Sequence, residues 1–238
     1  MKSKVIAVLL AAVIPFSLAA CGKGEMNEAQ SAEEPVPTEA VQATEAPKEL
    51  TRAEKLLADG EAGNGRAYTD LGKMYESGNS VEQDYDKALE YYLLSAEAEN
   101  PDFKGMRLAG LLYLNGTGVE QDFAKAAECF QAAAEAGDVS AAYFLGQLYE
   151  TGSGIEQSGA EAKKWYEEAV STVDEFLSNS KNNGPDELKL ALCRLAELAL
   201  AEGDTDTAVT YYQYAATLGW SAAADKLTEL GVSTETAG

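Results

Sequence analysis

The most constraining feature of this sequence is a pattern of tyrosine, glycine and alanine that recurs three times. Tyr75, Tyr113 and Tyr149 are separated by 38 and 36 residues. Leucine, glycine and alanine keep the same spacing around them, at Leu71, Gly72, Gly78, Ala88, Gly110, Gly116, Ala126, Leu145, Gly146, Gly152 and Ala162. A recurrence of this length indicates stacked supersecondary units, each of which buries its apolar face against its neighbours.

Each repeat has the periodicity of two helices joined by a tight turn. In the third repeat, small and apolar residues fall at positions i, i+4, i+5 and i+8, which is one face of a helix: Ala141, Leu145, Gly146 and Tyr149. Small residues on that face let a partner helix approach closely, and we expect the tyrosines to fill the inter-helix core. The glycines that follow favour a turn with positive φ. The predicted fold class is therefore all-α, an array of helix–turn–helix repeats.

Residues 109–134 carry the pattern in full. They read AGLLYLNGTGVEQDFAKAAECFQAAA and resemble the Sel-one-like repeat, a helix–turn–helix unit related to the tetratricopeptide repeat. The resemblance covers residues 63–173. It implies a right-handed superhelical array (an α/α solenoid), adaptor roles in protein complexes and no catalytic residues. The third copy departs from the pattern at Ser158 and Gly159, which replace an aspartate and an aromatic residue, so we expect its turn to be looser.

Capping segments flank the repeats. Thr51 followed by Glu54 is a capping-box signature, so residues 51–173 are predicted to hold an N-terminal capping helix and three Sel-one-like repeats. The turn-rich residues 174–187 interrupt the period and are predicted to be an insertion loop. Residues 188–238 are predicted to form a degenerate tetratricopeptide-like repeat with a shorter turn, followed by a C-terminal capping helix.

The first 20 residues have the composition of a signal peptide. Lys2 and Lys4 precede an apolar stretch that is too short to span a bilayer comfortably. The sequence LAAC at 18–21 resembles a bacterial lipobox, which implies that Cys21 is acylated and becomes the first mature residue. Residues 21–50 are rich in Glu, Ala, Pro and Thr and are predicted to be a disordered tether. We therefore expect a lipid-anchored protein of the bacterial cell envelope, with its repeats outside the cytoplasm.

Composition excludes several classes of function. The chain has no histidine, which removes histidine bases, serine–histidine–aspartate triads and imidazole zinc sites. Its net charge of −22 disfavours nucleic acid as a partner. The cysteines at positions 21, 129 and 193 are too scattered for a disulfide framework or a CxxC metal site. We expect no metal and no cofactor, a monomer, and the lipid anchor as the only link to a membrane.

The resemblance also implies that the first helix of each repeat lines a concave groove. Counting from the equivalent positions Leu71, Ala109 and Leu145 predicts five groove positions in each of the three repeats. Nine of them are the candidate partner-binding residues: Arg66, Thr69, Lys73, Lys104, Arg107, Leu111, Leu114, Tyr143 and Gln147. The other six are Glu76, Ser77, Asn115, Ser140, Glu150 and Thr151. The four cations among the nine candidates predict a basic patch on an otherwise acidic protein. Such a patch suits a protein or peptide with a carboxylate-rich segment, because charge-assisted hydrogen bonds to carboxylates are strong.

Two other functions remain open from the sequence. A peptidoglycan or polysaccharide binder is suggested by Tyr143, which register places beside Gln147 and Asn115. A carboxylate-dependent cell-wall hydrolase needs two carboxylates that converge across a cleft. Acidic pairs are frequent in this sequence, and none of them is singled out.

Overall fold

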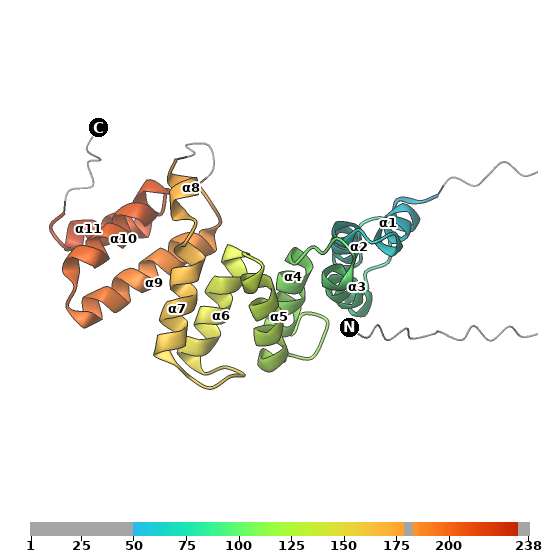
Figure 1. The fold of residues 1–238 in the computed structure, drawn as a ribbon, viewed down its shortest axis with the longest axis horizontal. Coiled ribbons are helices and arrows are strands. Elements are labelled where there is room, and N and C mark those ends of the chain that lie inside the picture. The colour runs from blue at the N-terminus through green and yellow to red at the C-terminus, as the bar shows by residue number, and fades with distance from the viewer. Residues whose placement is uncertain (1–49, 179–182, 233–238) are drawn as a thin grey trace, which may run out of the picture. The chain divides into compact units, whose positions relative to one another are not determined.

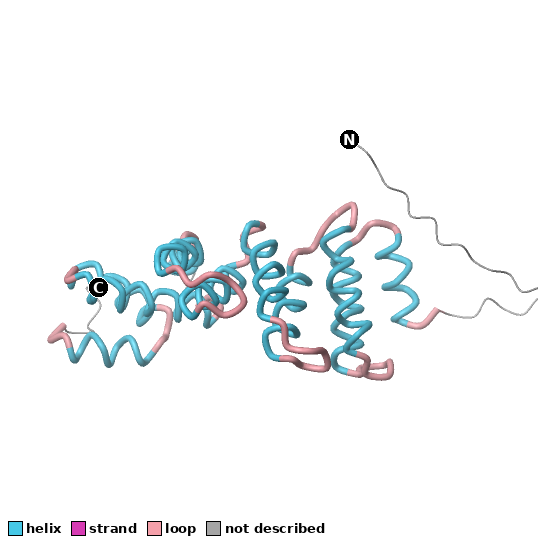
Figure 2. The backbone as a smooth tube through the Cα atoms, turned by 90° about the horizontal axis from the view of Figure 1, so that it is seen from below, coloured by secondary structure: helices cyan, strands magenta, loops and turns pink. Residues whose placement is uncertain are grey.

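The computed structural model describes residues 50–178 and 183–232, all of which belong to one compact unit, Pro47–Gly238. The predicted signal peptide, the lipobox with Cys21 and nearly all of the predicted tether lie outside the described residues. The described residues form helices joined by short loops, without a strand (Figures 1 and 2). The helices are α1 (Arg52–Glu61), α2 (Gly65–Ser77), α3 (Tyr85–Glu97), α4 (Lys104–Asn115), α5 (Phe123–Glu135), α6 (Val139–Thr151), α7 (Gly159–Val170), α8 (Val173–Leu177), α9 (Asp186–Glu202), α10 (Thr205–Thr217) and α11 (Ser221–Glu229).

Eight of these helices form four helix–turn–helix units. Unit 1 consists of α2 and α3, unit 2 of α4 and α5, unit 3 of α6 and α7, and unit 4 of α9 and α10. The two helices pack together within each unit, and α3, α5 and α7 also pack against the first helix of the next unit (Figure 1). This arrangement confirms the predicted all-α array of helix–turn–helix repeats.

A glycine in the first helix of units 1 to 3 receives an aromatic ring from the second helix. The pairs are Gly72 with Tyr92, Gly110 with Phe130 and Gly146 with Tyr166, and an added Cβ would lie 2.6 to 2.7 Å from the ring. Any larger residue would therefore push the two helices apart. The three rings are fully buried, and so are the predicted core positions Leu71, Ala88, Ala109, Ala126, Leu145 and Ala162.

The tyrosines of the repeated motif are less buried than the sequence predicted. Tyr75, Tyr113 and Tyr149 are half-buried, and the second-helix aromatics paired with glycine fill the inter-helix core instead. The motif tyrosines lie in the last turn of the first helix, where the chain leaves for the loop, so their rings reach the surface. In units 1 and 2 a lysine ammonium covers the ring, with Lys87 5.1 Å and Lys125 5.2 Å from the ring centroid.

The turn inside units 1 to 3 has one conformation. Gly78, Gly116 and Gly152 end the first helix with φ values of 70°, 64° and 70°, in the left-handed region that favours glycine. Five residues later, a glutamine side chain donates a 2.8 Å hydrogen bond to a carbonyl of the first helix, in the pairs Gln83–Glu76, Gln121–Leu114 and Gln157–Glu150. The glycines therefore have the role in the turn that the sequence predicted.

The third turn is closed in the same way as the first two. The Ser158 hydroxyl accepts a 3.2 Å hydrogen bond from the Glu161 amide, as the Asp84 and Asp122 carboxylates do from the corresponding amides. The Ser158 amide donates to the Tyr149 carbonyl at 2.9 Å, against 3.0 Å in the other two turns. The prediction of a looser third turn is therefore wrong, because a serine hydroxyl caps a helix as well as an aspartate does.

The flanking segments complete the array. The predicted capping box is present at α1, where the Glu54 amide donates to Thr51 Oγ1 at 3.2 Å and the Thr51 amide donates to Glu54 Oε2 at 2.7 Å. The predicted insertion loop contains the five-residue helix α8 and then residues 179–182, which are not described. The predicted C-terminal capping helix is α11, which packs against α10.

Candidate binding surface

Three of the nine candidate partner-binding residues are exposed cations. The Arg66 and Lys73 side chains are 69% and 49% exposed and share Asp70, at 3.9 and 3.6 Å from its carboxylate oxygens. Ion pairs of this kind on a helix surface contribute little, so both cations can reorient toward a ligand. Lys104 is exposed at the start of α4, and the described residues offer its ammonium no ion-pair partner.

Arg107 is committed to a contact inside the protein. Its Nε donates to Asp138 Oδ2 at 2.9 Å, and the side chains of the two residues are only 25% and 15% exposed. Asp138 also caps α6, since its carboxylate accepts a 3.0 Å hydrogen bond from the Ala141 amide. The pair thus connects the first helix of unit 2 to the start of unit 3. The sequence pattern singled out Arg107 but not Asp138, because the two residues come from different repeats.

Thr69 and Tyr143 are core residues. Thr69 is 1% exposed, and its buried Oγ1 has no hydrogen-bond partner among the described residues. Tyr143 is 6% exposed, and its hydroxyl accepts a 3.1 Å hydrogen bond from Gln147 Nε2. Neither ring nor hydroxyl is open to a ligand, which corrects the prediction that these two residues line a groove. It also removes the aromatic platform that suggested a glycan.

Apart from Gln147 on α6, which is half-buried, the remaining predicted residues lie on the first helices of units 1 and 2. Leu111 and Leu114 are half-buried and pack against the core with one side. Together with the three exposed cations they form what we call the cationic face: Arg66, Lys73, Lys104, Leu111 and Leu114. It offers positive charge beside a modest apolar edge, a combination that suits an acidic peptide segment.

A tyrosine–glutamate hydrogen bond connects the two helices of units 1 and 3. The Tyr92 hydroxyl donates to Glu76, and the Tyr166 hydroxyl donates to Glu150 Oε2, the latter at 2.7 Å. Burial, together with the adjacent carboxylate, raises the pKa of both phenols above the ordinary value. Unit 2 has Leu114 and Phe130 at the corresponding positions, so carboxylate and hydroxyl are both replaced by apolar groups.

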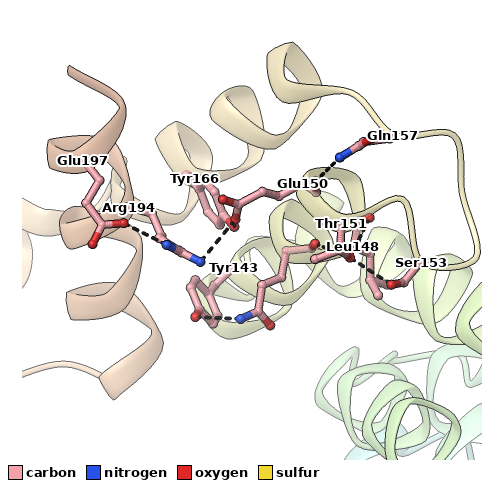
Figure 3. Close-up of polar contacts among 10 residues, drawn as sticks. Tyr143, Leu148, Glu150, Thr151, Ser153, Gln157, Tyr166, Arg194 and Glu197 are labelled. Carbon is pink, nitrogen blue, oxygen red and sulfur yellow. Dashed lines mark hydrogen bonds and ion pairs between the residues drawn. The ribbon is translucent and has the colours of Figure 1, made fainter. Parts of the chain in front are cut away.

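Arg194 extends this contact from unit 3 to unit 4 (Figure 3). Its guanidinium lies 2.8 Å from Glu197 on the same helix and 3.7 Å from Glu150 on α6. The hydrogen bond to Glu197 is the main cause that raises the pKa of Arg194. The surface of α6 and α9 is therefore interlocked by its own charges. The groove count from the sequence included Glu150, but it did not indicate Arg194 as its partner.

The described residues contain no group of three or more histidine, cysteine, aspartate or glutamate side chains that could hold a metal ion. Cys129 and Cys193 are free thiols, and burial raises the pKa of each to about 11. Both thiols are protonated at neutral pH, which is the unreactive form.

In the part of the chain that the structure describes, every helix is too short or too polar to cross a bilayer.

Solved structures of two bacterial repeat proteins are similar to this chain. One is c5321, a protective antigen present in uropathogenic Escherichia coli strains that displays an SLR fold, with 27% identity and a TM-score of 0.63. That match covers 78% of this chain but 38% of the E. coli chain, so this chain spans little more than a third of that protein. The other is a Sel1 repeat protein from Oxalobacter formigenes, with 26% identity, a TM-score of 0.58 and 75% of each chain covered. No curated protein matches.

The Sel1 repeat family model matches four segments, 65–100, 104–138, 139–171 and 188–220. These segments coincide with units 1 to 4. The match to unit 4 corrects its description as a degenerate tetratricopeptide-like repeat, because the same model that matches the first three units matches this one. The match does not include α1 and α11, which the sequence predicted as caps. Because the four segments cover more than half of the sequence, the chain belongs to the Sel1 repeat family.

Proposed function

We propose that this chain is a lipoprotein of a bacterial cell envelope whose repeats form a non-catalytic scaffold for a protein or peptide with a carboxylate-rich segment. Sel1 repeat proteins generally mediate protein interactions and are typically non-catalytic scaffolds. The anchor, the location and the chemistry of the partner are our proposal. The net charge of −22 makes copies of the chain repel one another, which supports a monomer.

The proposed anchor rests on the lipobox at 18–21. Acylation of Cys21 would attach more than one acyl chain to one residue, which gives stable membrane association where a single chain does not. Metabolic labelling with radioactive palmitate tests it. We expect label in the wild-type protein and none in a Cys21→Ser variant, with the protein shifting from the membrane fraction to the soluble fraction. Equal label in both proteins would contradict the anchor.

The observation that carries the binding proposal is the cationic face itself. In a chain with 18 basic and 40 acidic residues, Arg66, Lys73 and Lys104 are exposed on neighbouring first helices of units 1 and 2. Exposed cations on adjacent elements attract a negatively charged segment and orient it, while the surrounding acidic surface repels it from other places.

A fluorescently labelled hexaglutamate peptide, with a hexaglutamine peptide as its uncharged twin, tests this in 150 mM salt. We expect the full chain to bind hexaglutamate and not its twin. The double variant Arg66→Glu/Lys104→Glu should weaken binding by about tenfold or more, because two attractive contacts become repulsive. The matched control is Lys164→Glu/Lys226→Glu, which changes the net charge equally on exposed residues of unit 3 and of the C-terminal capping helix α11. Equal losses in both double variants, or no binding by the wild type, would overturn the proposal.

A further inference from the structure

The turns of units 1 and 2 each hold a lysine between a tyrosine ring and an aspartate. In unit 1, Lys87 Nζ lies 5.1 Å from the centre of the Tyr75 ring and 3.1 Å from Asp84 Oδ2. An ammonium over an aromatic face with a carboxylate beside it is a favourable site for a cation. The protein fills this site with its own side chain.

Unit 2 repeats the arrangement. Lys125 Nζ lies 5.2 Å from the centre of the Tyr113 ring and 3.4 Å from Asp122 Oδ2. These residues line an open hollow of about 500 Å³, which Asp86 and Glu120 also line. The turn is thus a place where a cation, an aromatic ring and carboxylates come together on the surface.

Unit 3 keeps the backbone of this turn and changes its side chains. Glu161 stands at the position of Lys87 and Lys125, three residues after the helix cap, and its amide makes the same capping hydrogen bond. The last turn of the first helix again holds a tyrosine, Tyr149, which is half-buried like its counterparts. The third turn therefore has the ring and a carboxylate, and it lacks the lysine of the other two turns.

Among the described residues, no lysine ammonium covers the Tyr149 ring as Lys87 and Lys125 cover Tyr75 and Tyr113. The neighbouring cation, Lys164, lies instead 5.5 Å from the centre of the Trp165 ring. Its contact with Glu161 is 3.5 Å long between side chains that are 66% and 44% exposed, which a competing cation can displace.

We propose that Tyr149 and Glu161 bind a lysine or arginine side chain of a partner protein. The incoming cation takes the place that the internal lysine occupies in units 1 and 2, with its charge over the Tyr149 ring and its N–H groups donating to the Glu161 carboxylate. The net charge of −22 favours the approach of a basic segment. This surface lies on a different unit from the cationic face and has the opposite charge preference, so it goes beyond the proposed function.

Fluorescence anisotropy with the full chain and a labelled Gly-Ser peptide that contains two lysines tests the proposal, with a twin peptide in which both lysines are glutamine. Glu161→Lys places a lysine where units 1 and 2 have Lys87 and Lys125. The new ammonium should cover the Tyr149 ring and so occupy the proposed site. We expect it to weaken binding of the lysine peptide by about tenfold, because an exposed cation–aromatic contact and an ion pair are both lost. Glu168→Lys, an exposed residue of the same helix with the same change of charge, should weaken binding by less than about threefold.

A second measurement separates the site from the general acidity of the surface. Zero-length carbodiimide coupling joins a carboxylate to a lysine amine in direct contact, and peptide mass spectrometry then locates the amide bond. We expect coupling of the lysine peptide at Glu161 in preference to Glu168. Thermal melting of each variant establishes that it is folded. Equal weakening by the two variants, coupling without preference for Glu161, or binding of the glutamine twin as tight as that of the lysine peptide would overturn the proposal.

Discussion

The first helices of units 1 and 2 and those of units 3 and 4 use polar side chains in opposite ways. In units 1 and 2, Arg66, Lys73 and Lys104 are exposed. Arg66 and Lys73 share the surface carboxylate of Asp70, and within the described part of the chain Lys104 has no ion-pair partner. In units 3 and 4, Arg194 lies between two carboxylates, one of which also accepts the hydroxyl of a buried tyrosine. Unit 1 also has a tyrosine–glutamate pair, Tyr92 with Glu76, so the two halves differ in the pairing of their cations and not in that hydrogen bond.

Arg107 shows what this difference teaches. From the sequence it belonged with the exposed cations, yet its guanidinium lies 2.9 Å from Asp138 and connects unit 2 to unit 3. A cation is available to a partner when its own ion pair is long and exposed, as for Arg66 and Lys73 with Asp70, and not when the pair is short and largely buried, as for Arg107. The proposed cationic face thus lies on the first two units, whereas Arg194 of unit 4 is paired with carboxylates, and mutations can test that difference.

The largest effect is expected at Tyr166. Tyr166→Ala removes a fully buried ring that packs on Gly146 and a hydroxyl that donates to Glu150. The free energy of unfolding should fall by about 3–5 kcal/mol, as for other buried aromatics cut to alanine. Urea denaturation measures it, with Lys104→Ala as the control at below about 0.5 kcal/mol. A loss of under 1 kcal/mol at Tyr166 would remove the basis for calling the second half interlocked.

Arg107→Ala should have an intermediate effect. It leaves the largely buried carboxylate of Asp138 without its partner, which should cost about 1–2 kcal/mol of unfolding free energy. Lys73→Ala is the matched variant from the exposed set and should change it by less than about 0.5 kcal/mol. Equal losses in the two variants would place Arg107 back among the free cations.

Thr69→Val should raise stability slightly. The Thr69 hydroxyl is buried without a hydrogen-bond partner among the described residues, and valine has the same shape without the polar group. An increase of up to about 1 kcal/mol in unfolding free energy is expected, because burying an unpaired hydroxyl is unfavourable. Chemical denaturation of this variant beside Thr69→Ser separates the methyl from the hydroxyl. A clear loss of stability in Thr69→Val would mean that the hydroxyl is paired in solution.

The smallest effect concerns pH and compares the turns of units 2 and 3. Hydrogen bonding from the Lys125 amide lowers the pKa of Asp122, so the ionised carboxylate stabilises the folded state. That contribution is fully present above the unfolded pKa of about 4 and is lost as pH falls below it. Asp122→Ser, which copies Ser158 of unit 3, should flatten the fall of the melting temperature between about pH 5 and 3. If the melting temperature of Asp122→Ser fell with pH as steeply as that of the wild type, protonation of Asp122 would not be coupled to unfolding.

Much of the fold was predictable because the same turn glycines and buried small residues recur in three consecutive repeats. Glycine at Gly78, Gly116 and Gly152, the capping box at Thr51 and the buried alanines follow from backbone conformation, capping and period alone. The prediction of a looser turn at Ser158 was wrong. Replacing aspartate with serine does not change the geometry of the turn, because the serine hydroxyl accepts the same hydrogen bond from the helix.

The candidate site was harder to predict. Counting positions along the repeats predicted that Thr69 and Tyr143 line the groove, although both are buried. Such a count does not show how much of each side chain the neighbouring helices cover. Arg107 with Asp138 and Arg194 with Glu150 join residues 31 and 44 positions apart, from different units. Such contacts depend on how one unit sits on the next, which the repeat pattern does not encode.

The alternation of Glu76–Tyr92, Leu114–Phe130 and Glu150–Tyr166 has a consequence for how the chain selects its own neighbours. Tandem units of similar sequence can mispair during folding, since each second helix meets several acceptable first helices. If α5 packed on α2, Glu76 would face a phenyl ring and lose its hydroxyl donor. If α3 packed on α4, the Tyr92 hydroxyl would face leucine. Each error removes a native hydrogen bond and leaves an apolar group in place of its partner, so the alternating pairs should disfavour exchange between adjacent units.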